Sequence, residues 1–358
     1  MPGHNHTRTR TIISTVGTSL LSNCSKDQGR IPNDSDLANF LRHSEPIRAC
    51  AESNSISRMV QAGDRLIFLS SNTPDGERCA RCLEAHFSKL NSCSIERIDR
   101  LNYQASQFKM LGLRDLVAKL IKLVREERKN GREVLLNPTG GFKAEIAYAT
   151  LVGLLFDVPV YYIHEAFPDI IEMPPTPIGW DYSLIALHDE LLEWIAADLR
   201  RSNEVESRLL GNPSAAKLRL LLTEEDGFTF LSPTGDAFYE SYQEHLQSAQ
   251  GAQVYLSDNA FATLNAADAD TQALFERTLR KLALKELWIA GGDRVHGSDC
   301  VVFPKGHRNE RVFFYEDDDG AVRVCELSRH SDQSYERLMK KGIFRAAYSL
   351  NNGWRLQS

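Results

Sequence analysis

The chain lacks any apolar run that approaches the roughly 20 residues needed to cross a bilayer. Hydrophobic residues make up 42% of its 358 residues, and charged residues make up 25%. The N-terminal residues 1–10 are polar, contain His and Arg, and offer no apolar signal core. These absences exclude a membrane-spanning protein, and we expect a globular protein in the cytoplasm with no membrane partner.

Cysteine pairs of the kind that build disulfide frameworks or zinc sites are also missing. The seven cysteines are odd in number and scattered. Cys79 and Cys82 form a lone CxxC motif without a matching second pair. We therefore expect free thiols in a reducing compartment and no bound metal or other cofactor.

An excess of cations is the third absence. The chain has 42 Lys and Arg against 48 Asp and Glu, a formal net charge of −6. Residues 251–358 hold 15 residues of each sign. A protein that coats nucleic acid through bulk electrostatics needs a positive surface, so any RNA contact must be local, in a cationic pocket.

The first half of the chain alternates strand-like and helix-like segments, which predicts a doubly wound parallel sheet. Three of the strands end in loops rich in Gly, Ser, Thr and Asn. Several ligand-facing loops would therefore converge at one sheet edge. The expected strands cover residues 11–16, 64–70, 94–99, 133–136 and 158–163, and the expected helices cover 77–90 and 114–129.

Residues 134–150 are the most informative stretch. An apolar run stops at Asn137, two glycines follow at Gly140 and Gly141, and an alanine-rich helical pattern begins. A strand, tight turn and helix in this order place free backbone N–H groups and a positive helix end at the carboxyl edge of a sheet. Lys143 adds a mobile cation. The pattern predicts a site for a phosphorylated or nucleotide ligand.

A Pro-rich break at residues 168–177 ends this domain near Pro177. Residues 180–210 and 215–224 are helical in pattern, and residues 227–231 and 232–238 suggest a small β-ribbon before a last helix at 235–247. This order predicts a winged helix-turn-helix connector. It could be a passive spacer, a dimerisation module or a DNA reader, but residues 215–222 offer only two cations for DNA.

The C-terminal residues 251–358 predict an α+β domain with a curved antiparallel sheet. A strand at 253–256 and helices from 260 and at 270–287 precede strands at 299–303, 310–316 and 321–327, with a hairpin turn at 317–320. Cations, histidines and one tyrosine gather on or beside these strands. They are Lys305, His307, Arg308, Arg311, Arg329, His330 and Tyr335.

Arg311 and Arg329 are separated by about one hairpin, and no matching Asp/Glu pair flanks the cationic cluster as metal ligands would. Such a cluster suits metal-independent transesterification, in which the RNA 2′-OH attacks the adjacent phosphate. The arginines would offset the charge that develops on the phosphate. The alternative is that these are ordinary surface cations on a sheet.

The first 175 or so residues resemble the CARF family of ligand sensors in type III CRISPR defence. The resemblance lies in residues 17–19, 70–73 and 137–143. It implies a Rossmann-like dimer that binds a cyclic oligoadenylate across its two-fold axis. A metabolic mononucleotide site with the same turn is the alternative. The ligand residues implied are Gly17, Thr18, Ser19, Ser71, Asn72, Asn137, Thr139, Gly140, Gly141 and Lys143.

Residues 254–342 resemble the RelE family of ribosome-dependent mRNA interferases. Residues 311–315 are similar to the family's arginine-initiated central strand, and residues 327–330 followed by Tyr335 are similar to its ending. The resemblance implies that Arg311 braces the scissile phosphate, Arg329 stabilises or protonates the leaving oxygen, and Tyr335 orients a base.

One departure from the RelE pattern concerns the strand before the central arginine. Val302 and Pro304 stand where the family often has basic residues, and Lys305, His307 and Arg308 are displaced. Histidine is a common general acid or base in proteins, so His307 and His330 are natural substitutes for proton transfer.

Together these patterns predict a CARF–RelE fusion effector in three parts: a sensor at 1–177, a winged-helix-like connector at 178–250 and a ribonuclease at 251–358. We expect a cytoplasmic homodimer that is activated by cyclic tetra-adenylate and cuts mRNA on the ribosome. The alternatives are a ligand-responsive transcription regulator and a ring nuclease that degrades the cyclic oligoadenylate.

Overall fold

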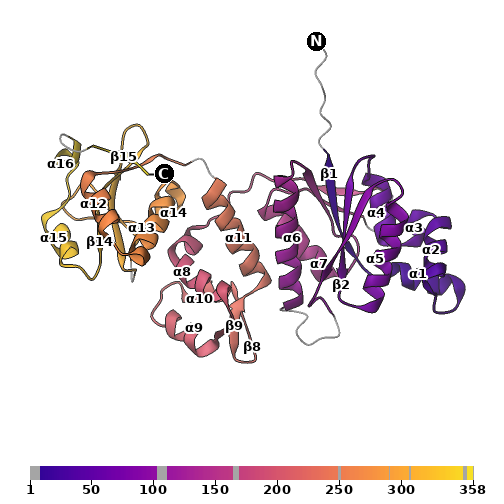
Figure 1. Ribbon diagram of the computed structural model, residues 1–358. Coiled ribbons are helices and arrows are strands. Elements are labelled where there is room, and N and C mark those ends of the chain that lie inside the picture. Colours follow the sequence, from indigo (N-terminus) through magenta and orange to yellow (C-terminus); the bar gives the residue numbers. More distant parts are fainter. Residues whose placement is uncertain are drawn as a thin grey trace, which may run out of the picture. The chain divides into compact units, whose positions relative to one another are not determined.

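The computed structural model describes residues 9–102, 111–163, 169–248, 251–289, 291–305, 308–349 and 353–357. The chain forms two compact units (Figure 1). The first unit comprises Met1–Ile178 and Asp198–Ser241, and the second unit comprises Gly179–Ala197 and Tyr242–Ser358. The architecture is mixed α/β in several parts, and the separate connector at 178–250 stays a prediction.

The first unit contains a six-stranded sheet in the order β3-β2-β1-β4-β5-β6. The strands β1 to β5 pair in parallel, as predicted, and β6 pairs antiparallel with β5. No strand was predicted at β6, within the Pro-rich stretch. The strands are β1 (Arg10–Val16), β2 (Arg65–Ser71), β3 (Ser92–Ile98), β4 (Glu133–Asn137), β5 (Val160–Tyr162) and β6 (Ile171–Met173).

Helices cover both faces of this sheet, with α1 to α5 on one side and α6 and α7 on the other (Figure 1). Strands covered on both faces are apolar almost throughout, and six of the seven residues in each of β1 and β2 are buried. The helices are α1 (Ser19–Gln28), α2 (Asp34–His43), α3 (Pro46–Ala49), α4 (Ala51–Met59), α5 (Pro74–Phe87), α6 (Leu111–Lys129) and α7 (Lys143–Leu155).

The strand order reverses between β1 and β4. The chain winds from β1 outward to β3, then returns to the other side of β1 to form β4. In open α/β sheets, ligands bind at the carboxyl ends of the strands that flank such a reversal. The sheet therefore brings the loop after β1 and the loop after β4 to the position where a ligand is expected.

The predicted β-ribbon of residues 227–231 with 232–238 is wrong. The strand β9 (Phe228–Leu231) pairs with β8 (Leu222–Glu225), because Asp226 and Gly227 form a two-residue turn with φ of 51° and 77°. Residues from Pro233 begin a helix that the Ser232 hydroxyl caps, accepting from the Gly235 N–H at 3.0 Å. The neighbouring elements are β7 (Arg200–Arg201), α9 (Ser202–Leu209), α10 (Ala215–Arg219) and α11 (Pro233–Ser248).

The second unit contains a sheet in the order β11-β12-β13-β14-β10-β15, in which β11 to β14 are antiparallel and β10 runs parallel to β14. The expected helix 270–287 is two helices, α13 and α14. The strands are β10 (Val254–Leu256), β11 (Asp293–Arg294), β12 (Val301–Phe303), β13 (Glu310–Glu316), β14 (Val322–Arg329) and β15 (Arg355–Leu356), and the helices are α8 (Ser183–Ala197), α12 (Asp258–Ala266), α13 (Ala269–Leu282), α14 (Lys285–Ile289), α15 (Gln333–Lys341) and α16 (Ala346–Ser349).

The two faces of this sheet carry different cores. Phe275 and Leu279 of α13 pack with Val312 and Phe314 on one face. The other face holds a smaller core around Phe313 and residues of α15. Neighbouring residues of β13 therefore face opposite sides of the sheet. Within the described ranges, no helix is both long and apolar enough to cross a bilayer.

A buried ion network anchors α8 within the second unit. The Lys281 ammonium is 2.6 Å from the Asp189 carboxylate, and Arg308 lies 3.3 Å from Asp189 and 2.7 Å from Glu310. The side chains of Lys281, Asp189 and Glu310 are at most 5% exposed. Burying these charges is favourable only because each has an opposite partner.

Asp189→Asn should destabilise the second unit strongly, because it leaves the Lys281 charge buried without its carboxylate. We expect the free energy of unfolding to fall by about 3–5 kcal/mol, measured by urea denaturation. The control is Glu193→Gln on the same helix, whose carboxylate pairs with Arg277 at 2.6 Å with both side chains partly exposed. It should cost less than about 1 kcal/mol. Equal effects of the two variants would contradict the role of the buried network.

Candidate functional site

The loops after β1 and β4 meet at the carboxyl edge of the first sheet. Ser14 of β1 pairs with Asn137 of β4, so the two strands end side by side. A Cβ atom on Gly17 would lie 2.7 Å from the backbone nitrogen of Gly141. Only a residue without a side chain permits this approach of the two loops. The predicted residues Gly17, Gly140 and Gly141 are therefore brought together.

The carboxylate of Glu52 lies between these loops. Glu52 belongs to α4, is 1% exposed, and accepts hydrogen bonds from the Gly17 N–H at 2.7 Å and the Ser19 hydroxyl at 3.2 Å. A Cβ atom on Gly140 would lie 2.0 Å from the same carboxylate. Glu52 thus fixes the predicted Gly17 and Ser19 against the glycine turn. It is not among the ligand residues predicted from the sequence, where its only signal is a glutamate in a polar helical stretch.

Hydrogen bonds of Asn137 and Thr139 hold the glycine turn in place. Asn137 is fully buried and donates to the Ser14 hydroxyl at 3.0 Å and the Ser55 hydroxyl at 2.8 Å. Its side-chain oxygen accepts from the Thr139 hydroxyl at 2.7 Å, and the Ile163 N–H donates to Thr139 at 3.4 Å. These two predicted site residues already have protein partners, so they shape the site rather than present free groups.

A second buried carboxylate, Glu145, lies in the first turn of α7. It is 2% exposed and accepts from the Phe142 N–H at 3.2 Å. Gly141 has a φ of 98°, and a Cβ atom there would lie 2.4 Å from Glu145. Burial raises the pKa of Glu145 to about 7, with a smaller contribution from the charge of Glu52. This carboxyl group therefore titrates near neutral pH.

The groups left for a ligand are on the surface of the same loops. Gly141, Phe142 and Lys143 are exposed, and Thr18 and Ser19 are half-buried. Lys143 has no ion-pair partner among the described residues. The N-terminus of α7 and this ammonium create a positive surface beside hydroxyl groups. The arrangement can bind a phosphate and can place an aromatic group against Phe142.

Ser71 ends β2 and Asn72 follows it, one strand further from the reversal. The Ser71 and Thr73 hydroxyls are 2.9 Å apart. The Asn72 amide donates to the Asp99 carbonyl at 2.5 Å, and its backbone N–H donates to Leu101 at 3.0 Å. The structure ties these predicted ligand residues to the end of β3 rather than to the glycine turn.

In the second unit, the structure brings together three residues of the predicted catalytic cluster. Arg311 is 3% exposed, and its guanidinium lies 5.7 Å from the Tyr335 ring centre. The His330 and Tyr335 rings are 4.8 Å apart. Arg311 also donates to the carbonyls of Arg308 and Glu310. A guanidinium, an imidazole and a phenol thus share one end of the sheet.

Other members of the predicted cluster lie elsewhere. The register pairs Arg311 with Ser328 and Glu310 with Arg329, which places Arg329 on the opposite face from Arg311. There Arg329 pairs with Asp332 at 3.3 Å and lines a cavity of about 340 Å³ beside Phe275.

The remaining predicted catalytic residues are also outside the trio. Arg308 belongs to the buried ion network, where it binds Glu310 at 2.7 Å. Lys305 is exposed in the segment that follows β12. His307 lies outside the described residues. Within the described part of the chain, no group of three or more His, Cys, Asp and Glu side chains could hold a metal ion.

The raised pKa of Glu145 makes the stability of the folded chain depend on pH. Its folded value of about 7 lies above its ordinary value of 4.5, so the folded chain holds a proton that the unfolded chain releases. This contribution is complete below pH 4.5 and is lost as pH rises through 7. Glu145→Gln cannot titrate, yet its amide oxygen can still accept from Phe142.

Between pH 5 and 8 the wild type should therefore lose about 2–3 kcal/mol of unfolding free energy relative to Glu145→Gln. Urea denaturation of both proteins across this range measures the difference. Parallel pH profiles for the two proteins would contradict the raised pKa.

One family model matches part of the first unit. Residues 47–176 match the family model described as CRISPR-associated protein (Cas_APE2256). The match covers less than half of the chain and lies within the first unit. It includes β4, the glycine turn and α7, which form one side of the site.

Two solved structures show weaker similarity. Can2 from Sulfobacillus thermosulfidooxidans, in complex with cyclic tetra-adenylate, has 13% sequence identity and a TM-score of 0.26, over 92% of this chain and 84% of that chain. Protein VC1899 from Vibrio cholerae has 10% identity and a TM-score of 0.26, over 76% and 85%. These scores are too low to define the fold or the ligand, and the similarity to a CRISPR-associated family rests on the match over residues 47–176.

Proposed function

We propose that the chain is a cyclic-oligoadenylate-activated endoribonuclease of type III CRISPR defence. The observation that carries this proposal is the glycine turn at the strand reversal of the first sheet. The turn lies inside the segment that matches a CRISPR-associated family, and it presents Lys143 and the N-terminus of α7. A phosphate-bearing ligand fits these groups.

A cyclic oligoadenylate suits the site because it combines phosphates with flat bases. Lys143 and the helix end would bind phosphate, the hydroxyls of Thr18 and Ser19 would accept or donate hydrogen bonds, and Phe142, which is 44% exposed, offers a face for an adenine. A symmetric ring needs two copies of such a site, so the active form is a homodimer. The CARF resemblance makes cyclic tetra-adenylate the first ring to test.

The trio of Arg311, His330 and Tyr335 supports the ribonuclease half of the proposal. In the proposed step the RNA 2′-oxygen forms a bond to the adjacent phosphorus, and the bond from phosphorus to the 5′-oxygen breaks. His330 is exposed, and its imidazole would accept the proton of the 2′-OH or donate one to the leaving 5′-oxygen. Arg311 would stabilise the additional negative charge on the phosphate, and Tyr335 would orient the substrate.

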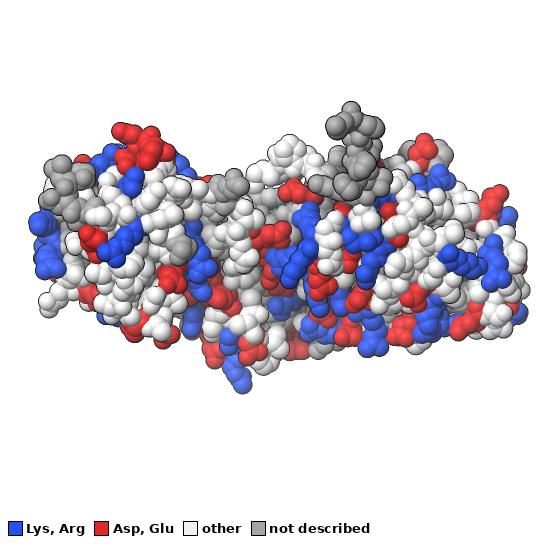
Figure 2. Space-filling model, turned by 45° about the horizontal axis from the view of Figure 1, so that its top comes forward, with Lys and Arg blue, Asp and Glu red and all other residues white. Residues whose placement is uncertain are grey.

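We place the cleavage at the ribosome because this protein is expected to bind free RNA only weakly. On the face drawn in Figure 2, the described Lys and Arg side chains are interspersed with Asp and Glu and form no continuous cationic band. The net charge of −6 also opposes binding to free RNA. A ribosome would supply the position and orientation of the mRNA that this surface does not.

His330→Ala should lower mRNA cleavage by about 100-fold or more, because a general acid or base is lost. The assay is a translating extract with and without cyclic tetra-adenylate, followed by mapping of mRNA 5′ ends. The matched control is Arg337→Ala, an exposed cation on α15, which should leave cleavage unchanged. Wild-type cleavage by His330→Ala would remove the trio from the mechanism.

Arg329→Ala in the same assay distinguishes the two faces of the sheet. Loss of cleavage with this variant alone would place the reacting phosphate beside the α12–α13 face. Loss with His330→Ala would place it beside Arg311.

Lys143→Ala should weaken binding of cyclic tetra-adenylate by at least about tenfold, because one charge-assisted contact to phosphate is lost. Isothermal titration calorimetry measures the affinity, and activation of cleavage should shift to higher ligand concentration by a similar factor. Lys129→Ala, an exposed lysine at the end of α6, is the control and should bind like the wild type. Unchanged affinity of Lys143→Ala would refute the assignment of the ligand site.

A further inference from the structure

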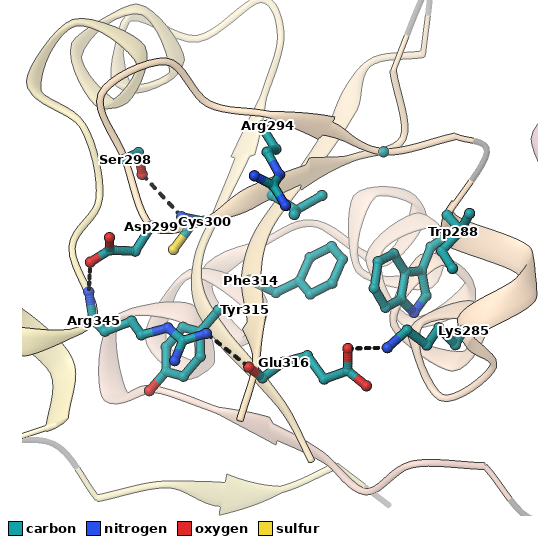
Figure 3. A pocket seen from close by; sticks show the side chains of 13 residues that line it. Lys285, Trp288, Arg294, Ser298, Asp299, Cys300, Phe314, Tyr315, Glu316 and Arg345 are labelled. Carbon is teal, nitrogen blue, oxygen red and sulfur yellow. Dashed lines mark hydrogen bonds and ion pairs between the residues drawn. The ribbon is translucent and has the colours of Figure 1, made fainter. Parts of the chain in front are cut away.

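The second unit contains a cavity of about 710 Å³ at the far end of β13 from Arg311 (Figure 3). Its lining includes Phe314 and Glu316 of β13, and residues of α14 and β11. Arg311 is the second residue of β13 and Glu316 is the last, so at about 3.3 Å per residue these two positions are roughly 16 Å apart along the strand. The cavity is thus separate from the proposed catalytic trio.

Two guanidinium groups line this cavity without a carboxylate partner among the described residues. Arg294 is exposed on β11, and Figure 3 shows its side chain reaching into the space above Phe314. Arg345 approaches from another side, donates to the Glu316 carbonyl at 3.0 Å and lies 4.5 Å from the centre of the Tyr315 ring. Both positive charges remain available to a ligand.

The two carboxylates of the cavity already have partners. The Glu316 carboxylate pairs with the Lys285 ammonium, and the Asp299 carboxylate accepts from the Arg345 backbone N–H at 3.1 Å. Three cationic side chains therefore face two occupied carboxylates, and the local charge is positive. Guanidinium groups bind phosphate through paired hydrogen bonds, so the charge favours a phosphate over a neutral ligand.

Part of the cavity lining is apolar. Ile289 is 60% exposed there, whereas Trp288 is 8% exposed and packs edge to face against the fully buried Phe314, 5.0 Å away. A volume of about 710 Å³ lies in the range of pockets that hold cofactors and other small molecules, and is far larger than one phosphate ion requires. The cavity therefore has room for a flat ring attached to the phosphate.

We propose that this cavity binds a nucleoside phosphate, with Arg294 and Arg345 on the phosphate and the base against Ile289 on the Trp288 side of the cavity. The same chemistry is offered by a free nucleotide and by one nucleotide of an RNA strand. The site is distinct from the cyclic oligoadenylate site of the first unit. Its occupation does not require that the chain cleave RNA.

The test uses the full-length chain without cyclic oligoadenylate. Binding of AMP, GMP, CMP, UMP and inorganic phosphate is measured by calorimetry, and binding of a fluorescein-labelled ten-nucleotide RNA by fluorescence anisotropy. Arg294→Gln and Arg345→Gln should each weaken the binding of the nucleotide probe by at least about tenfold. Arg280→Gln, an exposed arginine of α13 outside the cavity, is the matched control and should bind like the wild type.

Binding of mononucleotides identifies free nucleotides as the source, and binding of the RNA alone identifies an RNA strand. The proposal is overturned if neither probe binds, or if Arg294→Gln and Arg345→Gln bind as well as Arg280→Gln. Inorganic phosphate that binds as tightly as the nucleotides would overturn the role of the apolar part of the lining.

Discussion

The candidate ligand site depends on one buried carboxylate. Glu52 accepts hydrogen bonds from the loop after β1 and lies against Gly140 in the loop after β4. Without it, the Gly17 N–H would be buried with no partner, and the two loops would lose their common anchor. The glycines make the close approach sterically possible, and Glu52 makes it favourable. The small size of the glycines and the hydrogen bonds to Glu52 together set the geometry of this sheet edge.

This anchor has an electrostatic consequence for an anionic ligand. The N–H groups of Gly17 and Phe142 are already bonded to Glu52 and Glu145, so a phosphate must use the exposed groups above them. Two ionised carboxylates below a phosphate would oppose its binding. Because burial raises the pKa of Glu145 to about 7, this group can hold a proton at neutral pH and reduce that repulsion. An approaching phosphate favours the same protonated form.

The sequence predicts the parts whose signals are local. The parallel strands β1, β2 and β4 begin and end within two residues of their expected bounds, because apolar runs that stop at glycine or asparagine are unambiguous. The helices α1 to α3 have no counterpart among the predictions, and the bounds of α4 were not predicted. In α4 the polar residues 52–55 are all buried, so the apolar pattern that marks a helix is missing. The role of Glu52 could not be predicted from the sequence, because it arises only when α4 meets the loops after β1 and β4.

The second unit shows that the separation of two residues in the sequence does not establish that they share a site. Arg311 and Arg329 lie near the ends of one hairpin, but a shift of one residue in register moves a side chain to the other face.

The alternation of side chains along β13 also lets this one strand contribute to several sites. Glu310 belongs to the ion network, Arg311 to the proposed catalytic trio, and Phe314 to the proposed nucleotide cavity. A substitution within β13 would disturb all three through the shared backbone. The residues that can separate these roles are therefore His330, Arg294 and Arg345, which reach their sites from outside that strand.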